Sequence, residues 1–119
     1  MLTNEEVRRL IDIAGTGLHR GEVALARRIL TGVLTDRPRH TPAQIALAVT
    51  YLAVGDYSTA DQALQAVLKE HPEDADARAY LGLNQFLSGN KAEARTTLAP
   101  LTGDTSAASR LAHDVLSLC

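Results

Sequence analysis

The residues that could carry chemistry in this chain are few and far apart. No two of its four histidines are spaced i, i+4, and its single cysteine forms no Cys-x-x-Cys pair, so the ligand spacing of a zinc site is missing. We therefore predict no metal site. The side chains considered are His19, His40, His71, His113 and Cys119.

Two short patterns resemble chemical motifs but have more ordinary explanations. Gly15-x-Gly17 is a fragment of a dinucleotide-binding fingerprint, but no strand precedes it, as that fingerprint requires. The acidic run Glu73-Asp74-x-Asp76 could face a cation, but negative charge at a helix N-terminus is favourable without one. Cys119 has no basic neighbour in sequence that would activate its thiol. We predict that the protein is not an enzyme and uses no cofactor.

Composition narrows the class of protein. The chain has 119 residues, which suits a single domain covering residues 1–119. Its formal net charge of -2 gives no indication of a nucleic-acid partner. The lone cysteine cannot close an intrachain disulfide, which favours a reducing compartment. The N-terminus lacks the apolar region of a signal peptide, and the longest nearly apolar stretch, 45–54, is too short to cross a bilayer. We expect a cytoplasmic protein without membrane insertion.

A 34-residue period runs through the chain. Such a period is typical of stacked helix-turn-helix units. Arrays of these units usually build a binding surface and have no reaction centre of their own. The residues that keep the interval are Gly21, Gly55 and Gly89; Ala26, Ala60 and Ala94; and Leu30, Leu64 and Leu98.

Start and stop signals divide the period into helices. Thr3-x-x-Glu6 predicts a capping box at the first helix, and Pro100 should end the sixth. A last helix should cover the open side of the final pair with Leu111, Val115 and Leu118. The predicted helices span about 4–16, 22–34, 41–54, 57–70, 75–87, 91–99 and 106–118.

The repeated positions resemble the tetratricopeptide repeat. The repeat over 41–74 carries the most matches: Leu47, Ala48, Tyr51, Gly55, Asp56, Tyr57, Ala60, Leu64 and Pro72. The resemblance places repeats at 7–40, 41–74 and 75–108. It implies an all-α fold of three helical hairpins in a right-handed superhelical array, with the C-terminal helix as a cap. The motif's early aromatic residue is absent, and Ser106 stands in place of the third proline.

In such arrays the first helix of each hairpin lines a concave face. The helix over 41–54 is apolar nearly all round, and such a helix should be buried. The resemblance therefore implies an apolar groove that binds an amphipathic helix of a protein or peptide partner. A narrow groove and a groove filled by the last helix are the alternatives. The predicted groove residues are Ile11, Gly15, Leu18, Ile45, Val49, Leu52, Ala79, Leu83, Phe86 and Leu87.

A narrower resemblance concerns the first repeat. The segment Ala14-Gly15-Thr16-Gly17-Leu18-His19 is similar to the first repeat of small tetratricopeptide chaperones in bacterial type III secretion. This resemblance implies a chaperone that holds the needle subunit, with a small helical co-chaperone on the N-terminal repeat. The other interpretation is a generic adaptor or assembly scaffold that associates with itself as a homodimer.

Gly15 and Gly17 leave two explanations open. Each costs about 1 kcal/mol relative to alanine inside a helix. Either they allow the backbone of a partner to approach, or the first helix ends early at Thr16.

Overall fold

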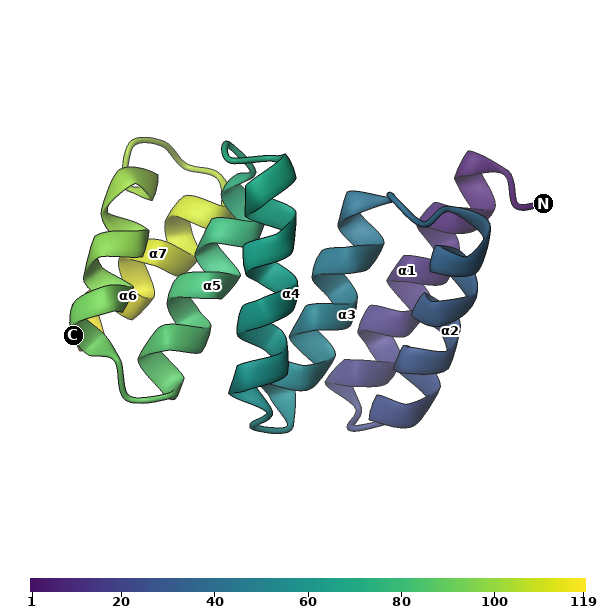
Figure 1. Cartoon of the computed structure of the whole chain (residues 1–119), viewed down its shortest axis with the longest axis horizontal. Helices are drawn as coiled ribbons and strands as arrows, with labels where there is room; N and C mark the ends of the chain where they lie inside the picture. The colour runs from purple at the N-terminus through teal and green to yellow at the C-terminus, as the bar shows by residue number, and fades with distance from the viewer. The chain divides into compact units, whose positions relative to one another are not determined.

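The computed structural model describes residues 1–119 and contains α-helices, one 3-10 helix and no strand. The predicted all-α fold of helical hairpins is confirmed (Figure 1). The chain divides into two compact units, residues 1–50 and 51–119, which we describe separately. The elements are α1 Asn4–His19, α2 Val23–Asp36, α3 Thr41–Ala53, α4 Tyr57–Glu70, α5 Ala75–Leu87, α6 Lys91–Leu98, η1 Ala99–Leu101 and α7 Ala107–Leu118.

The repeated glycines close the turns that follow α1, α3 and α5. The φ angles are positive at all three: 82° at Gly21, 81° at Gly55 and 95° at Gly89. No residue other than glycine has a positive φ. Residues with a Cβ rarely adopt this left-handed conformation, so the 34-residue repetition of glycine has a backbone cause.

The early end of the first helix at Thr16 is wrong, because α1 continues to His19. The Gly21 amide donates to the Leu18 carbonyl oxygen at 3.0 Å, and the Glu22 amide donates to the Gly17 carbonyl oxygen at 2.8 Å. Gly17 is buried. Tertiary packing of α1 therefore outweighs the low helix propensity of its two glycines.

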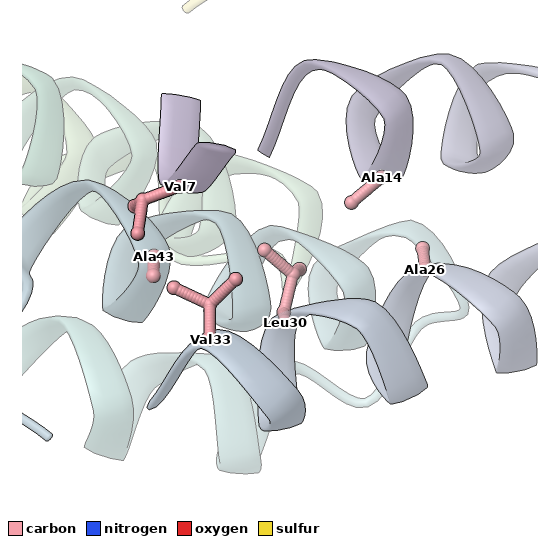
Figure 2. Packing of buried hydrophobic residues seen from close by; sticks show 6 residues of the cluster. All are labelled: Val7, Ala14, Ala26, Leu30, Val33 and Ala43. Atoms are coloured by element: carbon pink, nitrogen blue, oxygen red, sulfur yellow. The ribbon is translucent and has the colours of Figure 1, made fainter. Parts of the chain in front are cut away.

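The core of the first unit lies between α1, α2 and the start of α3. Figure 2 shows its buried side chains, among which the three alanines leave room for close helix packing. The predicted capping box is present, since Thr3 Oγ1 accepts from the Glu6 amide and Glu6 Oε1 accepts from the Thr3 amide. The hydrogen bond from the Thr3 amide to the carboxylate is the main cause that lowers the pKa of Glu6. The buried cluster is Val7, Ala14, Ala26, Leu30, Val33 and Ala43.

Polar side chains connect the elements of this unit. Arg27 Nε donates to Thr50 Oγ1 at 3.1 Å, and Arg27 Nη2 donates to the Thr50 carbonyl oxygen at 3.3 Å. Thr50 is fully buried, so these bonds fix α2 against α3. At the N-terminus, the Leu2 amide donates to Asp36 Oδ2 at 3.2 Å, which attaches the first residues to the end of α2.

In the second unit α5 packs against α4, α6 and α7 (Figure 1). Gly82 of α5 meets the buried Leu98 of α6 so closely that a Cβ at Gly82 would lie 2.2 Å from Leu98 Cδ2. Asn84 is buried, and its Nδ2 donates to the Tyr57 carbonyl oxygen at 2.9 Å, which ties α5 to the first turn of α4. The absence of a side chain at Gly82 therefore allows α5 and α6 to cross closely.

The end of α6 and the start of α7 follow the predicted signals. The α-helix ends at Leu98 and a 3-10 turn continues through Pro100. Ser106 caps α7 by accepting from the Ser109 amide. Asp104 Oδ1 accepts from the Ser106 amide at 2.8 Å and from Ser109 Oγ at 2.7 Å, and the pKa of Asp104 is lowered, first by the backbone hydrogen bond from Ser106.

The buried face of α7 differs in part from the prediction. Val115 is buried and Leu111 is partly buried, but Leu118 is 64% exposed. The buried line of the helix runs through Ala108, Ala112 and Val115, whereas Leu118 occupies the last helical position and lies beyond it. The buried contacts of α7 therefore come from Ala108 and Ala112 together with Val115, and Leu118, which the sequence pattern predicted to be buried, takes no part.

Candidate functional site

The first unit places three predicted groove residues on one face of α1. Ile11, Gly15 and Leu18 are spaced four and three residues apart, which puts them on one stripe of the helix. Ile11 and Leu18 pack in part against the core but keep exposed surface. Gly15 is exposed, and no atom lies within 4 Å of the position of a Cβ added there. We call this stripe the α1 face.

Four of the predicted groove residues lie on α5 of the second unit, and three of them keep exposed surface. Leu83 and Phe86 are half-buried, and they pack against the cluster that contains Ala112 and Val115 of α7. The last helix therefore covers part of their surface. Leu87, one position further on, is 44% exposed. We call Leu83, Phe86 and Leu87 the α5 face.

The remaining predicted groove residues lie deeper. Ile45 is 7% exposed, Leu52 is 9% exposed and Ala79 is 1% exposed, so they offer little surface to a partner. Val49 is half-buried. Helix register predicts the direction of a side chain but says nothing of the neighbours that cover it. The residues that keep solvent-exposed surface are Ile11, Gly15, Leu18, Val49, Leu83, Phe86 and Leu87.

Sequence reasoning missed an exposed apolar face on the α1–α2 hairpin. Ile13 is 53% exposed and Leu25 is 41% exposed, and both line a shallow cavity of about 300 Å³. Leu10 and Ile29 line a second cavity of about 470 Å³ on the same two helices. We call these four residues the hairpin face. Ile13 lies 34 residues before Leu47, so the repeat pattern predicts packing for it, and no signal in the sequence indicates its exposure.

The outer surface of α7 has the opposite character. Its exposed residues are mostly polar or charged, as expected for an element that closes an array. They include Arg110, His113, Asp114 and Ser117.

No group of three or more His, Cys, Asp or Glu side chains is placed to hold a metal ion. The carboxyl pKa values that are lowered, those of Glu6 and Asp104, have helix-capping hydrogen bonds as their main cause. None of the helices combines the length and the apolar character that crossing a membrane requires.

Comparison with known proteins agrees with this architecture. A family model described as tetratricopeptide repeat matches residues 18–67 and 51–117. The chain belongs to the tetratricopeptide repeat family. No curated protein matches it in sequence.

Solved structures show the same fold for this tetratricopeptide protein. A chain in a structure titled "CopN-Scc3 complex" superposes with a TM-score of 0.72 over 98% of this chain and 71% of that chain. The two sequences are 13% identical, so the likeness concerns the fold. A tetratricopeptide array is a protein-binding fold without a catalytic centre of its own, and this chain has that architecture.

Proposed function

We propose that this tetratricopeptide protein is a cytoplasmic chaperone that holds an amphipathic helix of a type III secretion subunit on its predicted groove residues. The observation that carries the proposal is the exposed apolar surface on the first helix of a hairpin in each unit. The α1 face keeps surface on Ile11 and Leu18, and the α5 face exposes 44% of Leu87. Apolar residues at helical spacing suit an amphipathic helical ligand.

The energetics require that most of this surface takes part. Burial of one apolar side chain contributes about 1.5–3 kcal/mol, so about four of them give on the order of 10 kcal/mol. The loss of translational and rotational freedom on association costs about 4–15 kcal/mol. A partner that buried a single apolar side chain would bind weakly, so a useful affinity needs several of these anchors.

Replacing Leu87 with aspartate should weaken the binding of a co-expressed needle-type subunit by about tenfold or more, because a charge replaces a buried anchor. Leu118→Asp is the matched control, since Leu118 is 64% exposed and is not a groove residue. Both variants should keep the helical circular dichroism of the wild type. Affinity purification with isothermal titration measures the effect, and equal affinities for Leu87→Asp and the wild type would refute the role of the α5 face.

The hairpin face could bind one of two partners, a helical co-chaperone or a second copy of the chain. In the chaperone proposal it receives a small helical co-chaperone. In the alternative, a generic adaptor or scaffold, it mediates self-association as a homodimer. Ile13 and Leu25 would provide the apolar contact in either case, because both are large and exposed.

Light scattering of the purified chain separates the two. We expect a monomer for the chain alone and a one-to-one complex with the helical co-chaperone that Ile13→Asp abolishes. A stable homodimer that Ile13→Asp dissociates would instead favour the scaffold. Leu87→Asp serves as the control, since it should leave the hairpin face intact.

A further inference from the structure

A third cavity of the first unit, of about 430 Å³, adjoins the α1 face. It lies where the first two turns of α1 meet the start of α3. Ile11 lines it and also belongs to the α1 face, so the cavity and the predicted groove surface share a side chain. Its lining residues are Asn4, Val7, Arg8, Ile11, Asp12, Arg37, His40 and Pro42. We call it the basic pocket.

The lining of the basic pocket includes two arginines and one carboxylate, that of Asp12. Arg37 also pairs with Asp36, whose Oδ2 lies 3.7 Å from Arg37 Nε, so Arg8 is the arginine of the pocket without an ion pair. The N-terminus of α3 adds the positive end of a helix dipole, and the first turn of that helix contains no acidic residue to offset it.

The two arginines differ in how many of their hydrogen-bond donors are already used. Arg37 is held in place, because its Nη2 donates to the Leu2 carbonyl oxygen at 2.9 Å and its Nη1 donates to Asn4 Oδ1. Arg8 makes no hydrogen bond or ion pair, including none with Asp12 one turn further along α1. The imidazole of His40 is likewise unpaired. The pocket therefore offers a free guanidinium beside an apolar side chain.

We propose that the basic pocket receives a carboxylate from the partner, an aspartate or glutamate side chain about one helical turn from the apolar residue that sits on Ile11. This inference rests on the proposed function and adds a chemical requirement to it. A guanidinium with free donors binds a carboxylate by charge-assisted hydrogen bonds, and the apolar contact beside it fixes the register. The partner helix would therefore have an acidic end as well as an apolar stripe.

The test uses two synthetic peptides and the full chain. Both peptides are amphipathic helices with the same leucine stripe, and they differ only in that one carries glutamates in the turn next to the first leucine where the other carries glutamines. Fluorescence anisotropy measures their affinities. We expect the wild type to bind the glutamate peptide about fivefold more tightly, and added salt to reduce that preference.

Neighbouring arginines provide a matched pair of variants. Arg8→Gln should abolish the preference for the glutamate peptide. Arg9→Gln should keep it, because Arg9 is exposed, pairs with Glu5 at 2.9 Å and does not line the pocket. His40→Gln tests the second unpaired side chain and should reduce the preference in part.

The possible results have distinct meanings. Equal binding of both peptides by the wild type would overturn the pocket while leaving the helix-binding function in place. An undiminished preference in Arg8→Gln would also overturn it. If neither peptide binds, the proposed helix-binding function fails, and the inference fails with it.

Discussion

Gly82→Ala should lower the free energy of unfolding by about 2–3 kcal/mol and the melting temperature by roughly 10 °C. The added methyl carbon would lie 2.2 Å from Cδ2 and 2.3 Å from Cγ of Leu98, which is fully buried. Either α5 and α6 must separate or Leu98 must leave its rotamer. Chemical and thermal unfolding followed by circular dichroism measure the loss.

Two further variants isolate the cause of that loss. Gly15→Ala is the control for helix propensity, because position 15 is helical and open, and it should raise stability by about 0.5–1 kcal/mol. In the double variant Gly82→Ala/Leu98→Ala, the new methyl group enters space that the smaller side chain vacates. Its loss should be smaller than the sum of the two single losses by about 1 kcal/mol or more. If the two single losses simply added in the double variant, the contact with Leu98 would not be the cause of the instability of Gly82→Ala.

Asn84→Asp should reduce stability by about 3 kcal/mol or more at neutral pH. Asn84 is 2% exposed, and its Nδ2 donates to the Tyr57 carbonyl oxygen, so an aspartate there would place a buried carboxylate oxygen against another acceptor. Its Oδ1 has no partner to gain. Protonation removes the charge, so the penalty should be small below pH about 4 and should grow as the pH rises. Urea unfolding at several pH values measures it.

Asn84→Leu separates the charge from the loss of the hydrogen bond. It removes the donor to the Tyr57 carbonyl, which costs about 1–3 kcal/mol, but it also removes the buried unpaired Oδ1, which offsets part of that cost. We expect a change within about 1 kcal/mol and no dependence on pH. An equal loss in Asn84→Leu and Asn84→Asp would mean that the hydrogen bond, and not the charge, matters at this position.

Several elements were predictable because their signals are local. The Thr3–Glu6 capping box involves atoms of one helical turn, and the positive φ of Gly55 is required by one turn. The range 57–70 predicted for the fourth helix coincides with α4, since a turn precedes it and Pro72 follows it. The 34-residue period identified the family for the same reason: each repeat carries its own complete set of signals.

The sequence by itself therefore determined the helices, their turns, the family and the direction in which each side chain points. Only the tertiary structure decided which of those side chains are covered. Ala79 and Leu87 were both assigned to the groove, yet Ala79 is 1% exposed and Leu87 is 44% exposed. The hairpin face at Ile13 and the basic pocket at Arg8 likewise depend on where segments distant in sequence pack. Periodicity reports the face of a helix on which a residue lies, whereas burial depends on neighbours that no local pattern encodes.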